Sequence, residues 1–117
     1  MHGLDSSTDL SFLVGSMLIQ VSVGQNELIF CFEPRTLITV ESTFGIGDET
    51  SMNYFTDAPS SASKAAALLG LEVEGFDISD TGTTTLHFQG GSRVTVLDDS
   101  EHYESYTIIH GTKTIVV

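Results

Sequence analysis

The segment Leu13-Val14-Gly15-Ser16-Met17-Leu18-Ile19-Gln20-Val21-Ser22-Val23 carries the strongest structural signal in the chain, because its pattern occurs twice. The residue class at six of its positions, Leu13, Val14, Gly15, Leu18, Val21 and Val23, returns 55 residues later in Leu68-Leu69-Gly70-Leu71-Glu72-Val73-Glu74-Gly75-Phe76-Asp77-Ile78. The correspondence then continues at an offset of 56, where Leu28, Phe30 and Phe32 match Thr84, Leu86 and Phe88, and Ile38-Thr39-Val40 matches Val94-Thr95-Val96. Residue class and spacing agree over about 28 positions, which indicates a duplicated structural unit.

Each copy predicts a short helix followed by three strands. Gly15 and Gly70 stand where a helical turn needs a left-handed stop, and alternating apolar residues then indicate strands. The expected division is repeat one at 8–46, a loop-like connection at 47–60, repeat two at 61–110 and a closing strand at 114–117. Within repeat one, residues 37–46 are expected to form one continuous strand.

The predicted fold class is α+β, with mostly antiparallel strands in a single domain. One three-stranded sheet with one small helix covers little of its own apolar face. We therefore expect the two pseudo-symmetric helix-strand-strand-strand repeats to form one sheet or a partly closed barrel.

The charge balance excludes several classes of partner. The chain has 16 acidic and four basic residues, for a net charge of −12, and contains 14 serines and 14 threonines. Binding to nucleic acid or to anionic membranes depends on Lys and Arg, so neither is expected. A basic protein partner is compatible with this charge, since the field of the chain would accelerate its arrival.

The densest polar segment is the acidic loop at 98–104. Its partner-binding candidates are Asp98, Asp99, Glu101, His102, Tyr103 and Glu104. The spacing of an EF-hand is absent, and His102-x-Glu104 lacks the cysteine pair of a zinc deaminase, so no metal site is predicted. A solvated loop with no role in binding is the alternative interpretation of such a charge run.

Ile29 and Cys31 make one strand apolar on both faces. The matching positions of the second copy are Thr85 and His87. Either a helix or loop of the same chain covers Ile29 and Cys31, or they form the face of a homodimer. Cys31 has no second cysteine to pair with and is expected to act as a small hydrophobic residue.

Catalytic signatures are lacking. The sequence contains no Gly-x-Ser-x-Gly, no Ser-x-x-Lys and no phosphate-binding glycine loop, and its histidines do not have zinc-ligand spacing. We therefore predict a protein without cofactors that is not an enzyme. An enzyme would need a cleft in which a carboxylate meets His87 or His102.

The repeated Leu-hydrophobic-Gly start, the β-rich body and the segment Tyr103-Glu104-Ser105-Tyr106 resemble a bacterial family of small domains of unknown function. In that family a Tyr-Glu-x-aromatic step precedes a final strand after a glycine turn, as at 111–117, although Trp is more usual than Tyr106. The resemblance covers residues 10–117. It implies a bacterial, cytoplasmic protein and no particular activity.

The functional expectation is a non-catalytic binding module that engages another protein through its acidic loop, as inhibitors and immunity-type proteins do. The second hypothesis is a small-ligand or divalent-metal-binding protein with its site between the repeats or at the acidic loop. No signal peptide is expected, because the apolar run at 12–19 has no basic residue before it.

Overall fold

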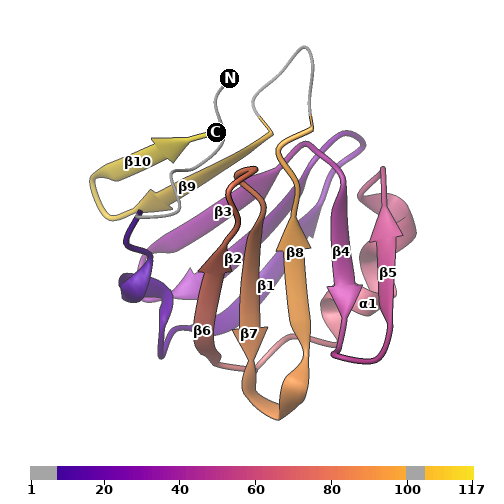
Figure 1. Cartoon of the computed structure of the whole chain (residues 1–117), viewed down its shortest axis with the longest axis horizontal. Helices are drawn as coiled ribbons and strands as arrows, with labels where there is room; N and C mark the ends of the chain where they lie inside the picture. The colour runs from indigo at the N-terminus through magenta and orange to yellow at the C-terminus, as the bar shows by residue number, and fades with distance from the viewer. Residues whose placement is uncertain (1–7, 100–104) are drawn as a thin grey trace.

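The computed structural model describes residues 8–99 and 105–117, and its described part is a sandwich of two five-stranded antiparallel sheets (Figure 1). Sheet A has the order β1-β2-β3-β9-β10, and sheet B has the order β5-β4-β8-β7-β6. The strands are β1 (Met17–Val23), β2 (Leu28–Glu33), β3 (Thr36–Val40), β4 (Phe44–Gly47), β5 (Met52–Phe55), β6 (Val73–Ile78), β7 (Thr84–Phe88), β8 (Arg93–Val96), β9 (Tyr106–His110) and β10 (Lys113–Val116).

Helical structure is confined to short turns. The 3-10 turns are η1 (Ser11–Leu13), η2 (Pro59–Ser61) and η3 (Gln89–Gly91), and the α-helix is α1 (Ala62–Ala66). Asp9 starts η1 by accepting a 2.9 Å hydrogen bond from the backbone N–H of Ser11. No helix in the described residues has the length and apolar character required to cross a membrane.

The duplication extends over five strands in each half. The order β1-β2-β3-β4-β5 is repeated as β6-β7-β8-β9-β10, and each half sends its last two strands into the sheet of the other half. Thus β4 pairs with β8, and β9 pairs with β3 in the corresponding register. The two halves therefore exchange hairpins, and each sheet contains strands from both.

Contacts between the halves follow an approximate two-fold axis. The N–H of Gly15 donates to the carbonyl of Val73, and the N–H of Gly70 donates to the carbonyl of Leu18, both over 2.8 Å. Gly15 and Gly70 have nearly the same left-handed backbone, with φ of +87° and +86°. β1 and β6 are also interrupted at corresponding places, after Leu18 and after Val73. The duplicated sequence pattern thus specifies a duplicated backbone.

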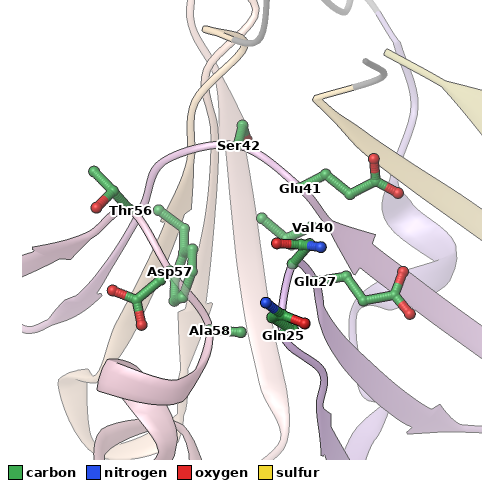
Figure 2. A pocket seen from close by; sticks show the side chains of 10 residues that line it. Gln25, Glu27, Val40, Glu41, Ser42, Thr56, Asp57 and Ala58 are labelled. Carbon is green, nitrogen blue, oxygen red and sulfur yellow. The ribbon is translucent and has the colours of Figure 1, made fainter. Parts of the chain in front are cut away.

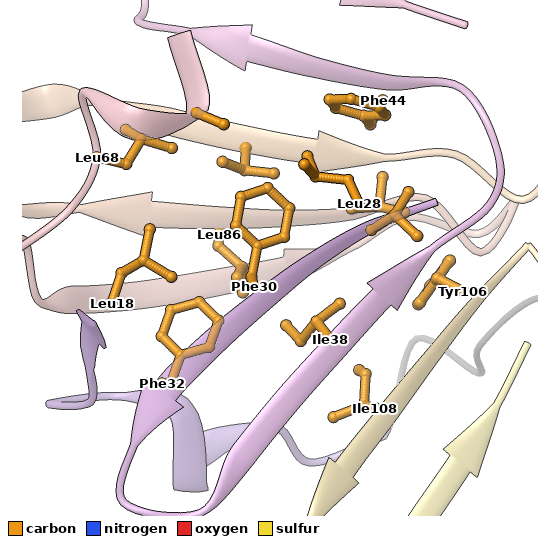
Figure 3. Packing of buried hydrophobic residues seen from close by; sticks show 14 of the residues in the cluster. Leu18, Leu28, Phe30, Phe32, Ile38, Phe44, Leu68, Leu86, Tyr106 and Ile108 are labelled. Atoms are coloured by element: carbon orange, nitrogen blue, oxygen red, sulfur yellow. The ribbon is translucent and has the colours of Figure 1, made fainter. Parts of the chain in front are cut away.

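The core lies between the two sheets (Figure 3). Alternate residues of the strands point inward, as period-2 patterning requires. Phe32 and Phe88, which match in the duplication, stack across the sheets with ring centroids 6.3 Å apart. The core is formed mainly by the inward residues of both sheets, among them Leu18, Leu28, Phe30, Ile38, Val40, Phe44, Ile46, Leu86, Val94, Val96, Tyr106 and Ile108.

The predicted fold class was wrong. The structure has two separate sheets, neither of them closed, in place of one sheet or a partly closed barrel. The first half has a 3-10 turn where a helix was expected, and the single short α-helix of the described residues lies in the second half. Because two open sheets packed face to face cover each other's apolar sides, the two repeats do not have to join into one sheet or close into a barrel.

Two further expectations about individual strands differ from the structure. Residues 37–46 were expected as one strand, but the chain leaves sheet A after Val40 and enters sheet B at Phe44. The connection at 47–60 was expected to be a loop, but it contains β5. Both differences concern the exchanged hairpin β4–β5. The repeated sequence pattern predicted only three strands in each half, so it did not indicate this hairpin.

Candidate functional site

The chain crosses between the sheets at one end of the sandwich, which we call the crossover end. Its crossings are the segments 41–43 and 97–105, of which 100–104 lie outside the described residues. The two crossings run side by side, since the N–H of Glu41 donates to the carbonyl of Ser105 over 2.9 Å and the N–H of Leu97 donates to that of Thr43 over 3.0 Å. The β1–β2 and β6–β7 hairpin loops end at the same place, because Leu28 pairs with Val40 in one sheet and Thr84 pairs with Val96 in the other.

Two acidic residues brace these crossings. A carboxylate oxygen of Asp99 accepts a 3.1 Å hydrogen bond from the backbone N–H of Thr43. Asp98 accepts a 2.7 Å hydrogen bond from the hydroxyl of Ser105. The Asp99 bond therefore joins the two crossings, and the Asp98 bond links the two described ends of the second crossing. Both side chains also add negative charge at this end.

Six of the 13 acidic residues that the structure describes lie at the crossover end, while Glu33, Asp48, Glu49 and Glu72 lie at the opposite end beside basic residues. The six at the crossover end are Glu27, Glu41, Asp57, Asp80, Asp98 and Asp99, and no described Lys or Arg lies among them. Three of the four basic residues lie at the opposite end: Arg35 in the β2–β3 turn, Arg93 at the start of β8 and Lys113 at the start of β10. The molecule thus has an electrostatic polarity along its strands, with the negative potential focused at one end.

A pocket of about 440 Å³ opens at the crossover end (Figure 2). Its apolar lining consists of Val40, Phe44 and Ala58, each no more than 3% exposed. The polar lining comes from the β1–β2 loop, the first crossing and the segment after β5: Gln25, Asn26, Glu27, Glu41, Ser42, Thr56 and Asp57. This volume lies in the range of small-molecule sites and is sufficient for one long side chain of a partner.

The carboxylates stand at the rim of this pocket and not at its base. Figure 2 shows Glu27 and Glu41 extending to the same side, with Asp57 on the other side of the opening. Asp57 accepts hydrogen bonds from the N–H of Ser60 over 2.9 Å and from its hydroxyl over 2.8 Å. These bonds lower the pKa of Asp57, so it keeps its charge.

In the second half, the side chain of Tyr106 lies at the position that corresponds to this pocket. Tyr106 takes the place of Phe44, and its hydroxyl donates to the carbonyl of Gly82 over 2.9 Å and contacts the Thr84 hydroxyl over 2.7 Å. In the first half the matching residues are Phe44, Asn26 and Leu28, so no hydroxyl bridges the corresponding gap. In the first half, residues 56–58 form part of the pocket wall.

Of the acidic-loop candidates, Asp98 and Asp99 lie at the crossover end, while Glu101, His102, Tyr103 and Glu104 lie outside the described residues. Sequence reasoning missed the pocket and its acidic residues Glu27, Glu41 and Asp57. The missing signal was spatial: these residues come from separate segments, and only the exchange of hairpins brings the segment after β5 beside the β1–β2 loop. Within the described ranges, no three His, Cys, Asp or Glu side chains are grouped so as to hold a metal ion.

Ile29 and Cys31 lie together on the outward face of β2, and both are partly exposed. Their neighbours on this face are side chains of β1 and β3, with Cys31 opposite Leu37 and Ile29 opposite Thr39. Partial burial raises the pKa of the Cys31 thiol.

A carboxylate does meet a histidine on sheet B. The Nε2 atom of His87 lies within hydrogen-bond distance of a carboxylate oxygen of Asp77. The pair stands on the outward face of the sheet, where the Asp77 side chain is 77% exposed, and it lies away from the pocket. An open, solvated face does not offer the water-excluded geometry that acid–base catalysis uses.

No protein-family model, curated protein or solved structure compared with this chain matches it.

Proposed function

We propose that this protein is a non-catalytic binding module whose crossover end receives a basic segment of a partner protein. The observation that carries the proposal is a pocket with buried apolar lining residues, whose polar lining includes the carboxylates Glu27, Glu41 and Asp57. Asp80, Asp98 and Asp99 lie at the same end of the sandwich outside the pocket, and no described Lys or Arg accompanies these six residues. A Lys or Arg side chain fits this arrangement, because its aliphatic stem can lie on Val40 and Phe44 while its charged group stays near the rim.

The charge distribution also supports a directed encounter. Three basic residues at the opposite end leave the crossover end as the face that attracts a cationic surface. Electrostatic attraction of this kind acts mainly on the association rate and is screened by salt. Inhibitors and immunity-type proteins that bind a basic protein work in this way, and this class of role is the one we propose.

A titration with an octalysine peptide tests the site. We expect backbone amide shifts to concentrate at residues 25–27, 41–43 and 56–58, and the association rate to fall at least tenfold between about 50 and about 300 mM salt. The triple variant Glu27→Gln, Glu41→Gln, Asp99→Asn should bind at least about tenfold more weakly, because three attractive carboxylates are removed.

The matched control removes the same number of charges elsewhere, with Glu49→Gln, Glu72→Gln and Glu74→Gln. We expect this control to lose less than about threefold in affinity, since these residues lie away from the crossover end. Equal losses in the two triple variants would mean that only the net charge matters, and the proposed site would then be rejected.

The pocket volume favours a second candidate, a small organic cation bound in place of a partner side chain. Spermidine and a divalent cation such as Ca²⁺ are suitable probes, with the midpoint of thermal unfolding as the measurement. A rise with spermidine that is lost in Glu27→Gln/Glu41→Gln would favour the small ligand. A rise with Ca²⁺ alone would favour the metal hypothesis at the acidic loop.

A further inference from the structure

The two outward sheet faces are built on matching backbones but differ in polarity at several corresponding positions. Sheet A presents seven apolar side chains outward: Met17, Ile19, Ile29, Cys31, Leu37, Ile109 and Val116. Their counterparts on sheet B, found from the strand registers, are Glu72, Glu74, Thr85, His87, Arg93, Gly47 and Tyr54. At five of these positions, Met17, Ile19, Ile29, Cys31 and Leu37, sheet A has an apolar residue where sheet B has a polar or charged one. Ile109 and Val116 correspond to Gly47 and to the exposed Tyr54, which are not polar replacements of this kind.

Exposure on the sheet A face is considerable. Ile19 is 53% exposed, Val116 is 44% exposed, and Met17 and Leu37 are each 39% exposed. Leu37 is on the central strand of the sheet and contacts Cys31 on one side and Ile109 on the other in the strand pairing. The contiguous apolar row of this face runs through Cys31, Leu37 and Ile109. The polar residues in the same outward register are Gln20, Ser22, Thr39, Thr107 and Thr114. Contiguous exposed apolar surface is typical of an interaction site.

The distribution of charge indicates that a second copy of this chain binds to the outward face of sheet A. In the outward register of sheet A the charged residue is Glu33, at the end of β2, although the whole chain carries a net charge of −12. Two copies of such a chain repel each other through most of their surface, and this neutral face is where they can approach closely. From these observations we infer that the sheet A face is a homodimer interface, formed by two copies packed face to face around Leu37.

The size of the face indicates how strong the dimer is. Five strands at a spacing of about 4.8 Å and a length of about 20 Å give a projected area of about 500 Å² per copy. A standard stable interface buries about 800 Å² per partner, so we expect a dimer that dissociates in the micromolar range or above. The crossover end lies along the strands and not on this face, so both copies keep it accessible, and the inference does not depend on the proposed function.

Sedimentation velocity from about 20 μM to about 1 mM tests the inference. The wild-type protein should shift from a monomer of 12.6 kDa toward twice that mass. Leu37→Glu should weaken association at least about tenfold, because it places two like charges in the contact. Thr95→Glu adds the same charge to the outward face of sheet B and should change association by less than about threefold.

Two further measurements separate the dimer from a folding defect and from the crossover end. Ile29→Thr with Cys31→His copies the sheet B residues, so it should fold with an unchanged circular dichroism spectrum and still reduce association. Salt should strengthen dimerisation by screening the repulsion, which is opposite to its expected effect at the crossover end. In wild-type protein, the reaction of Cys31 with a thiol reagent should slow as protein concentration rises.

A wild-type protein that stays monomeric at about 1 mM would overturn the inference. So would equal weakening by Leu37→Glu and Thr95→Glu, since the contact would then lie elsewhere.

Discussion

Tyr106 is the residue at which the two halves differ most in chemistry. It is 1% exposed, and its hydroxyl binds Gly82 and Thr84. The corresponding residues of the first half are Phe44, Asn26 and Leu28, and Phe44 has no hydroxyl. We expect Tyr106→Phe to lower the free energy of unfolding by about 1–3 kcal/mol, because it leaves two buried polar groups without their partner.

The double variant Tyr106→Phe/Thr84→Val provides the control. It removes both hydroxyls, so its cost should be smaller than the sum of the two single costs by about 1 kcal/mol. Urea unfolding of the four proteins measures this coupling. Strict additivity would show that the hydroxyls stabilise the protein independently.

Tyr106 also predicts a loss of stability in alkali. Burial raises its pKa to about 12. The unfolded chain releases this proton near pH 10, so the contribution is complete below pH 10 and is lost as the pH rises toward 12, by up to about 2–3 kcal/mol. Urea unfolding between these pH values measures the fall, and Tyr106→Phe should flatten it. A fall of the same size in Tyr106→Phe would assign it to other groups.

The turns that precede β1 and β6 offer a direct test of the duplication. A Cβ at Gly15 or Gly70 would meet no other atom within 4 Å, so the cost of a substitution there comes only from the left-handed backbone. Gly15→Ala and Gly70→Ala should each lower the free energy of unfolding by about 1–2 kcal/mol, and the two losses should be similar. Gly75→Ala is the control, since that position is equally open and its φ is not left-handed. Unequal costs at Gly15 and Gly70 would mean that the two turns are not energetically equivalent.

Sequence reasoning succeeded for elements whose pattern depends on neighbours along the chain. The glycine stops at Gly15 and Gly70, the strands β2, β6 and β7 and the closing strand β10 were predicted, because turn chemistry and alternation are local. The crossing at 41–43 was not predictable in this way. Ser42 is 9% exposed and continues the alternation of Val40 and Phe44, so the pattern runs unbroken while the chain changes sheets.

β5 was missed for a different reason. Met52-Asn53-Tyr54-Phe55 does not alternate, and its partner β4 contains Gly45 and Gly47. The side chain of Tyr54 lies over Gly45, where an added Cβ would come within 2.8 Å of its ring. An aromatic ring packed over a glycine on the neighbouring strand stabilises the strand pair. The strand propensities of the individual residues do not reveal this cross-strand contact. The pocket was missed with it, because residues 56–58 follow this strand.

For the whole molecule, the exchange of hairpins predicts that neither half folds alone. Residues 8–57 alone would lack the two strands that complete their sheet, as would residues 58–117. Each fragment should show little ordered β structure by circular dichroism. An equimolar mixture should recover the spectrum of the intact chain, with an affinity that reflects the shared core. A cooperative unfolding transition in either fragment alone would contradict this expectation.

Because the two halves belong to one polypeptide, the outward face of sheet A can be more apolar than the outward face of sheet B. A symmetric pair of identical subunits must carry every substitution twice, so a gain at one surface is imposed on the other. A tandem copy in one polypeptide escapes that constraint, and each half can specialise while its twin preserves the shared architecture. Leu37 in sheet A corresponds to Arg93 in sheet B, and Phe44 corresponds to Tyr106, so the two halves differ in chemistry at both pairs of matching positions.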